Sequence, residues 1–344
     1  MPSGIPSTFT DPIPYQVAVR NAKVELSVTG RGDFHAELTQ IDLNRLWMQY
    51  GSESLPRVSY AVVSSERPPI LFLADSNQAP VHYSGKELSL AAMVVNGVSS
   101  VHHLRTSGPC RWASVSLPSN DWAALASPVG RELIAGSFPS FVRPEPKYLS
   151  RLAELHRAIR QLAAVAPNTF SQPEVVRSLE QELMHAIMCC FARPEQIEVR
   201  SRHHSTIVKR FEDFLAANCN KPLYLAEICT SIGVSERTLR ICCEEYLGMS
   251  PNRYLLRRRM QLARRALTLA DPATTTVTQV AINHGFWELG RFAVSYRSLF
   301  GESPSTSLRR PATVGNSSGC QPSAPCISSS ARVGAFVENR SLSV

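Results

Sequence analysis

The pattern of apolar and polar positions changes character about halfway along the chain. From about residue 19 to 140, apolar residues alternate with polar ones in short runs that turn-forming residues interrupt, as in "VELSVTG" and "FHAEL". In the second of these runs, Phe34, Ala36 and Leu38 share one face. Period-two runs at this spacing predict a β-sandwich or a β-barrel.

The period becomes helical between residues 145 and 192. Leu149, Leu152, Leu155, Ile159 and Leu162 recur on one helix face. After the break "APNTFSQPE", Pro173 is well placed to open a second helix with an apolar stripe of its own. Helix pairs of this kind pack on a barrel or form a dimer interface, and the pattern leaves both open.

Two stretches in the last third of the chain repeat one pattern, "IGVSERTLRICCEEYLGMSP" and "HGFWELGRFAVSYRSLFGESP". Each has a Gly near its start, an apolar anchor in its middle and a Gly-x-Ser-Pro ending. Gly248 and Gly301 lie 53 residues apart, whereas Gly233 and Gly285 lie 52 apart. The copies therefore match except for one extra residue after the first Gly of the second copy.

Each copy predicts a helix-turn-helix motif. In the first, Gly233 follows a short amphipathic helix, where a left-handed residue ends a helix, and Ser235 can cap the next helix. The second helix of such a motif fits the DNA major groove. The residues predicted to pack inward are Leu225, Ile228, Cys229, Ile232, Leu239, Cys242, Cys243 and Tyr246 in the first copy and Val277, Val280, Ala281, Ile282, Phe286, Phe292, Tyr296 and Leu299 in the second.

The segment between the copies, "NRYLLRRRMQLARRALTLA", predicts one helix of about 28 Å, at about 1.5 Å per residue. One DNA turn is about 34 Å, so this rod can hold two reading helices over successive major grooves. Its predicted apolar stripe is Leu256, Met260, Ala263 and Leu267. Five of its arginines are expected to be solvated or to face phosphates rather than to read bases; they are Arg257, Arg258, Arg259, Arg264 and Arg265.

The predicted DNA-contacting residues are the outward positions of the two second helices. Arg237 and Arg240 are the best candidate base readers of the first motif and Arg291 of the second, with phosphate contact as the alternative. Arg297 is expected to contact a phosphate. The complete set is Ser235, Arg237, Thr238, Arg240, Ile241, Leu289, Gly290, Arg291, Ala293, Val294 and Arg297.

The net charge of +8 is concentrated in the segment that carries both copies. Residues 1–200 hold 18 Lys and Arg against 18 Asp and Glu, whereas residues 201–310 hold 16 against 9. A basic excess confined to one segment indicates a polyanion partner for that segment, with a merely solvated basic face as the alternative.

The segment 206–310 resembles the AraC/XylS family of bacterial transcription regulators. The resemblance covers both motifs, the connecting helix, both Gly-x-Ser-Pro endings and the one-residue offset, and "GFWELGRF" looks most like the branch with the ethanolamine-utilisation regulators. Three positions depart from the family: Cys243 stands for a usual Phe, Ile241 for a frequent base-contacting Arg, and Val294 occupies the equivalent place in the second motif. Trp287 also stands near the start of the second reading helix, where a small capping residue is more usual.

The resemblance implies an α+β chain. A cupin-like β-barrel with dimerisation helices would precede an all-α double helix-turn-helix domain. The implied function is a sequence-specific transcription regulator that responds to a small-molecule effector, forms homodimers and meets RNA polymerase if it activates. The boundaries that we expect are a loose segment at 1–18, a sensory and dimerisation domain at 19–192, a linker at 193–205, the DNA-binding domain at 206–310 and a disordered tail at 311–344.

Two other functions stay open: a cupin-type enzyme fused to a DNA-binding domain, and an N-terminal domain that dimerises without sensing. Because no His-x-His with a following Glu occurs, we expect no catalytic residues, no metal and no cofactor. The effector-binding residues are unknown. The candidates are the histidines His35, His82, His102 and His103, and the pocket-lining or structural residues Arg45, Trp47, Arg111 and Trp112.

Nine cysteines in irregular spacing, without a C-x-x-C pair, indicate free buried thiols, with a redox sensor as the alternative. No run of about 18 apolar residues occurs. The N-terminal sequence also lacks a basic start followed by an apolar stretch. We therefore expect no membrane span, no secretory signal and a cytoplasmic location.

Overall fold

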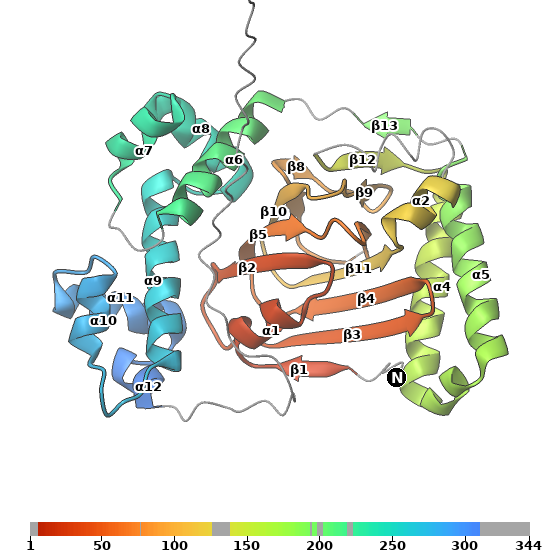
Figure 1. Ribbon diagram of the computed structural model, residues 1–344, viewed down its shortest axis with the longest axis horizontal. Helices are drawn as coiled ribbons and strands as arrows, with labels where there is room; N and C mark the ends of the chain where they lie inside the picture. The colour runs from red at the N-terminus through yellow and green to blue at the C-terminus, as the bar shows by residue number, and fades with distance from the viewer. Residues whose placement is uncertain are drawn as a thin grey trace, which may run out of the picture.

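The computed structural model describes residues 6–75, 77–125, 138–192, 195–197, 202–218 and 223–309. Two antiparallel β-sheets occupy its N-terminal part and seven helices, α6 to α12, its C-terminal part (Figure 1). The predicted α+β composition, with strands before helices, is confirmed. Within the described residues, no helix is both long and apolar enough to cross a membrane. The tail that we predicted at 311–344 lies outside these residues.

The larger sheet has eight strands and the smaller has five. In spatial order, the larger contains β1 (Ser7–Phe9), β3 (Ala36–Leu43), β4 (Leu46–Glu53), β11 (Cys110–Ser116), β6 (Pro69–Leu73), β9 (Met93–Val95), β12 (Ser140–Arg143) and β13 (Glu195–Ile197). The smaller contains β2 (Ala22–Val28), β5 (Arg57–Val63), β10 (Val101–Thr106), β7 (Val81–Tyr83) and β8 (Lys86–Glu87).

The two sheets pack face to face, and strand alternation gives the larger sheet a second apolar face. Leu38 and Trp112 of the larger sheet meet Leu104 of the smaller one in the core between them. On its other face the larger sheet packs against α4 (Pro146–Val165) and α5 (Pro173–Cys190), the two helices predicted from the stripes (Figure 1). No strand ladder joins the two sheets among the residues described, so these strands do not close into a barrel.

The start of the chain is more ordered than its composition suggested. β1 pairs with β3, and α1 (Pro12–Ala18) follows, with Asp11 accepting a hydrogen bond from the Ile13 amide at 2.8 Å. Tyr15 is buried and donates its hydroxyl hydrogen to Glu53 at 2.6 Å. The loose segment that we predicted at 1–18 is therefore wrong for residues 7–18, because pairing to β3 and burial of Tyr15 hold them.

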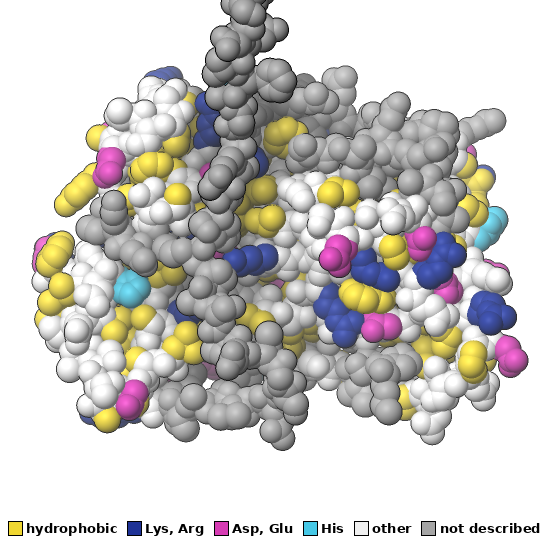
Figure 2. Space-filling model, in the orientation of Figure 1, with side chains coloured by type: hydrophobic (Ala, Val, Ile, Leu, Met, Phe, Trp, Pro, Cys, Tyr) yellow, Lys and Arg dark blue, Asp and Glu magenta, His cyan; other side chains and the backbone are white. Residues whose placement is uncertain are grey.

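Two short helices complete the N-terminal part, α2 (Ser119–Leu125) after β11 and the 3₁₀ helix η1 (Pro167–Ser171) between α4 and α5. In the view of Figure 2, acidic and basic side chains lie interspersed on this part, in agreement with its balanced charge. Within the predicted linker 193–205, β13 and the beginning of α6 form regular structure.

The helical part has two apolar cores. The first forms around α6 (Arg202–Ala217), α7 (Leu225–Ile232) and α8 (Glu236–Leu247), and the second around α10 (Val277–Asn283), α11 (Leu289–Phe300) and α12 (Pro304–Arg309). The helix α9 (Pro251–Leu269) contributes to both cores and joins them as the predicted rod (Figure 1).

Candidate nucleic-acid interface

The first motif has the predicted turn and cap. Gly233 ends α7 with a φ of 71°, in the left-handed region that glycine adopts at low cost. The side chain of Ser235 then accepts a hydrogen bond from the amide of Thr238 at 3.1 Å. This bond satisfies one of the free N–H groups at the start of α8 and sets the direction of the helix.

All the residues predicted to pack inward in α8 are buried, including the two adjacent cysteines. Burial raises the pKa of Cys242 to about 11 and raises that of Cys243 still further. Both thiols therefore stay protonated near neutral pH and act as small packing groups. A thiolate is the reactive form, so this environment does not favour the redox-sensor alternative.

The second motif repeats the turn at Gly285, whose φ is 76°, and builds its core from aromatic rings. The ring of Phe292 lies 4.8 Å from that of Phe286 and 5.5 Å from that of Tyr296, measured between centroids. The prediction that Ile282 packs inward was wrong. It is 41% exposed, because α10 is short and buries mainly Val280 and Ala281.

The predicted DNA-contacting residues form two accessible faces. In α8 and its cap they are exposed except Thr238, which is half-buried, and in α11 all of them are exposed. The side chains of Arg237, Arg240 and Arg297 make no hydrogen bond or ion pair with other described residues, so their guanidinium groups are available to a ligand.

Arg291 differs from the arginines of the first motif because it forms an ion pair with Glu288. Its Nε lies 2.9 Å from a carboxylate oxygen of Glu288, and both side chains are largely exposed. Glu288 occupies the cap position of α11 without a capping side-chain hydrogen bond. Beside it, Trp287 is 70% exposed, an indole next to the reading helix that residue spacing did not assign to the interface.

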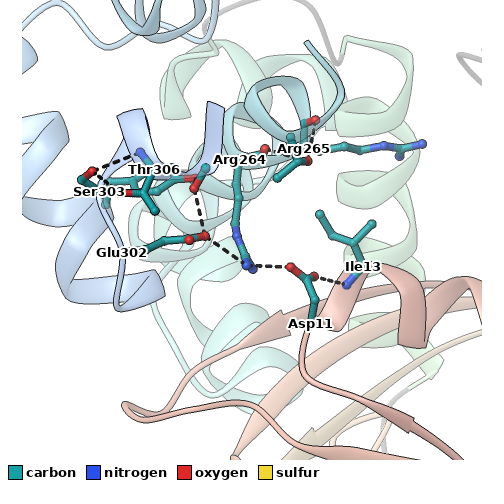
Figure 3. Close-up of polar contacts among 10 residues, drawn as sticks. Asp11, Ile13, Arg264, Arg265, Glu302, Ser303 and Thr306 are labelled. Atoms are coloured by element: carbon teal, nitrogen blue, oxygen red, sulfur yellow. Dashed lines mark hydrogen bonds and ion pairs between the residues drawn. The ribbon is translucent and has the colours of Figure 1, made fainter. Parts of the chain in front are cut away.

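The arginines of α9 were predicted to be solvated or to face phosphates, but most of them contact other parts of the chain. Arg257 donates to the Val28 carbonyl at 2.7 Å, and Arg259 lies near the Gly285 carbonyl and over the Phe286 ring. Arg264 lies between two carboxylates, at 2.7 Å from Asp11 and 3.4 Å from Glu302 (Figure 3). The prediction was wrong for these residues because the N-terminal part packs against α9 at Arg257 and Arg264, and the second motif packs against it at Arg259 and Arg264.

The apolar stripe of α9 also needs one correction. Met260, Ala263 and Leu267 are buried as predicted, but 41% of Leu256 is exposed and Leu255 is buried in its place. The start of α9 therefore contacts the first core through Leu255 rather than Leu256. Further along, Met260, Ala263 and Leu267 contact the second core.

Glu212 of α6 is the centre of a buried contact between the two parts of the chain. Only 1% of it is exposed, and its carboxylate accepts from the Tyr254 hydroxyl at 2.6 Å and from Arg258 at 3.1 Å. His103 of β10 lies 3.1 Å from the same carboxylate. Burial alone would raise the pKa of Glu212, but the hydrogen bond with His103, the charge of Arg258 and the bond from Tyr254 hold it below its ordinary value.

Sequence reasoning missed this cluster, although one signal was present. Glu212 stands between Phe211 and Leu215 in an otherwise apolar stripe of α6, and a charged residue in such a stripe requires a partner. The partners came from β10 and α9, which are remote in sequence. Arg258, predicted to be solvated, is one of them and also lies 3.7 Å from Glu25.

The other candidates in the N-terminal part separate into different environments. Trp112 lies in the core between the sheets and donates to Glu53 at 3.0 Å, whereas Trp47 is covered by the Arg67 guanidinium at 3.9 Å. Arg45 pairs with Asp121 and Arg111 with Asp75 on the surface.

Among the described residues, no three His, Cys, Asp or Glu side chains are grouped to hold a metal ion. His35 is exposed, and His82, His102 and His103 belong to no such group.

Known proteins share part of this chain's sequence. A family described as "Helix-turn-helix domain" matches residues 228–310. A probable thc operon regulatory protein of Rhodococcus erythropolis is 44% identical over 103 residues, which are 30% of this chain and 31% of that protein. XylDLEGF operon transcriptional activator 1 of Pseudomonas putida is 33% identical over 102 residues, again 30% and 31%.

These matches span about a third of the length of the curated relatives. Among solved structures, a probable AraC family transcriptional regulator from Rhodopseudomonas palustris CGA009 is 37% identical over 30% of this chain and 96% of that chain, with a TM-score of 0.28. The two motifs, their connecting helix and these sequence matches lead to one assignment: the chain belongs to the AraC/XylS family of transcription regulators.

Proposed function

We propose that this protein is a sequence-specific DNA-binding transcription regulator. The proposal rests mainly on the two reading helices, α8 and α11. Ser235 caps α8, and α11 follows the turn at Gly285. In both helices the outward residues are accessible while the inward residues are mostly buried. The connecting helix α9 has 19 residues and thus a length of about 28 Å, close to one DNA turn. That length supports simultaneous contact with two successive major grooves.

The proposed contacts divide by chemistry. Arg237 and Arg240 would read base edges, since a guanidinium pairs with guanine through two hydrogen bonds. Ser235, Thr238 and the exposed Ile241 would position α8 and contact apolar or sugar groups. In α11, Arg291 would read a base and Arg297 would hold a phosphate, beside apolar or shape contacts from Leu289, Gly290, Ala293 and Val294.

We also propose that the N-terminal part senses a small-molecule effector and reports to the DNA-binding part through β10. Successive residues of a strand face opposite sides. His102 stacks on Tyr83 inside the sandwich, with ring centroids 4.5 Å apart, while His103 faces Glu212. A change in the position of β10 therefore acts on the Glu212 cluster directly.

Further parts of the proposal rest on the resemblance. The sandwich would be a cupin-like variant, α4 and α5 would form a homodimer, and RNA polymerase would be a partner if the protein activates transcription. The domain boundaries 19–192 and 206–310 belong here too, as does action in the cytoplasm. We favour a regulator without catalysis over a fused enzyme, because the relatives are named as regulators.

Mapping of the DNA bound by the full-length protein, followed by mobility-shift titration of one recovered site, tests the function. We expect a recurrent sequence motif and an affinity that falls steeply as salt rises, because phosphate contacts release counterions. Binding without sequence preference, or no binding at low salt, would overturn the proposal. Purified protein that turns over a metabolite would favour the enzyme alternative instead.

The proposed coupling is tested with His103→Ala and the adjacent His102→Ala as a matched pair. We expect His103→Ala to change DNA affinity and to speed hydrogen exchange in α6 and α9, because Glu212 loses a buried partner. Exchange in these helices that is the same in wild type and His103→Ala would mean that the two parts are not coupled through this contact.

A further inference from the structure

The space between the two sheets is too small for an effector. The free volume there is about 70 Å³, because Tyr15, Trp112 and the buried ion pair of Glu53 with Arg57 fill the interior. Binding sites for small molecules usually have volumes of about 300–1,000 Å³. An effector of the proposed regulator therefore needs a site elsewhere, unless the sandwich opens.

A cleft of about 310 Å³ lies on the opposite, outer face of the larger sheet, beneath α4. Tyr50 of β4, Phe72 of β6 and Ala113 of β11 contribute its sheet side. Its helix side comes from Ala153, His156, Arg157 and Arg160, which the i, i+3, i+4, i+7 spacing places on one face of α4. We call this space the outer cleft.

The outer cleft is lined by more positive than negative charge. Arg111, Arg157 and Arg160 line it together with a single acidic residue, Asp75. Asp75 pairs with Arg111, whereas Arg157 and Arg160 form no ion pair with any residue that the structure describes. The Arg160 guanidinium lies 4.1 Å from the Tyr50 ring centroid, which fixes it at the cleft by a cation–π contact.

His156 is a buried polar group of this cleft whose ring interacts with the backbone of Ser114 and Gln49, so only part of its hydrogen-bonding capacity is open to a ligand. Only 3% of the residue is exposed, yet its Nε2 has no hydrogen-bond partner among the residues that the structure describes. Burial lowers the pKa of His156 to about 4, so the ring is neutral at physiological pH. A buried nitrogen without a partner is unfavourable, and a ligand that supplies the missing hydrogen bond removes that cost.

The neighbouring space extends the site. A larger hollow of about 740 Å³ shares Tyr50 and Arg111 with the outer cleft, and Gln78 also lines it. The Nε2 of Gln78 has no hydrogen-bond partner within the described part of the chain. The outer cleft thus adjoins a second hollow, while its own lining combines apolar side chains with two guanidinium groups that form no ion pair among the described residues.

We propose that the outer cleft binds a small organic carboxylate with a compact apolar body. The carboxylate would pair with Arg157 and Arg160, since guanidinium groups match its geometry with two hydrogen bonds. The apolar body would lie against Phe72, Ala113 and Ala153, and a polar atom would hydrogen-bond to His156. An effect of this ligand on DNA binding rests on the proposed function, but its binding does not.

The test uses full-length protein without DNA, followed by calorimetric titration and thermal unfolding. The probes are cyclohexanecarboxylate, its neutral amide cyclohexanecarboxamide, and inorganic phosphate, each up to millimolar concentration. We expect the carboxylate alone to bind and to raise the melting temperature, because only it offers both the charge and the apolar body. In protein with ¹⁵N-labelled histidine, the His156 ring nitrogen signals should shift on binding.

Variants locate the site. Arg157→Gln and Arg160→Gln should each weaken carboxylate binding by about tenfold or more, and His156→Phe should weaken it while keeping the fold. Arg151→Gln is the matched control, since Arg151 lies on the same helix but pairs with Glu182 outside the cleft. Equal binding of the amide, preference for phosphate, no binding of the carboxylate, or unchanged affinity in both arginine variants would each overturn the proposal. Since no DNA is present, these outcomes leave the proposed function to its own test.

Discussion

The two helix-turn-helix motifs repeat one sequence pattern, yet the molecule surrounds them differently. The core of the first motif includes Val58 from the smaller sheet, whereas the described core of the second contains only residues of α9 to α12 and of the turns between them. Gly248 and Gly301 end equivalent helices with φ angles of 68° and 73°. A Cβ on Gly248 would collide with the side chain of Arg105, whereas no described atom lies within 4 Å of one on Gly301.

The outward faces of α8 and α11 also differ, in charge and in exposed apolar side chains. In the first, Arg237 and Arg240 have no ion-pair partner among the described residues, whereas Arg291 of the second is paired with Glu288 beside exposed Trp287 and Val294. The two motifs therefore share one fold but present different chemistry to DNA. We infer that the first motif selects bases by hydrogen bonds and the second adds apolar and shape-dependent contacts.

The largest difference between the motifs should appear in the free energy of unfolding when a buried side chain of each core is shortened to alanine. Phe292→Ala should destabilise the second motif by about 3–5 kcal/mol, because a buried ring in contact with two other rings is lost. Cys243→Ala in the first motif should cost only about 1–2 kcal/mol, since a thiol buries far less apolar surface. Denaturant unfolding of both variants measures this, with hydrogen exchange to assign the loss to each motif. Similar losses would show that the two cores are equally packed.

Base selection should depend most on α8. Arg240→Ala should relax base preference at one position, a loss of about 1–3 kcal/mol of discrimination, and Arg291→Ala should have a smaller effect because Glu288 competes for the guanidinium. Binding-site selection on each variant measures the change. As a control, Arg297→Ala should weaken binding to all sequences about equally and reduce the salt slope by about one unit. A preferred sequence altered by Arg297→Ala but not by Arg240→Ala would reverse these roles.

The two reading helices should also differ in how much a cap stabilises them, because Ser235 caps α8 whereas α11 has no side-chain cap hydrogen bond. Ser235→Ala should lower the free energy of unfolding by about 1 kcal/mol, since α8 loses a side-chain acceptor for its first N–H groups. Ser235→Asn, which keeps an acceptor, is the matched control and should stay near wild type. Thermal unfolding without DNA separates this effect from any DNA contact of Ser235. A loss as large in the Asn variant as in the Ala variant would argue against capping as the cause.

The smallest effect concerns the ion pair on α11. Glu288→Gln should strengthen DNA binding by less than about 1 kcal/mol, because an exposed pair of this kind is worth little and its loss frees Arg291. Mobility-shift titration at low salt detects a change of a few fold. Glu244→Gln, on an exposed position of α8, carries the same charge change elsewhere. An equal gain in this control would assign the effect to net charge rather than to Arg291.

The local part of the structure could be predicted from the sequence because it depends on neighbouring residues. A glycine after an apolar stripe predicts the left-handed end of α7, and a serine two residues later predicts the cap of α8. The helical spacing of Leu152 and Ile159 likewise predicted α4. Interactions between residues within about one or two helical turns decide these features, so the sequence order already contains them.

The sequence by itself determined the order of strands and helices, the two motifs, their turns and which residues of each reading helix face inward. Only the tertiary structure decided that the strands form two separate sheets, that Arg257 and Arg264 bind the N-terminal part, and that Glu212 meets His103 across 109 positions of the chain. The physical reason is range. Helix periodicity and capping are set over a few residues, whereas the partners of a buried charge are set by which surfaces pack together, and that depends on the whole chain.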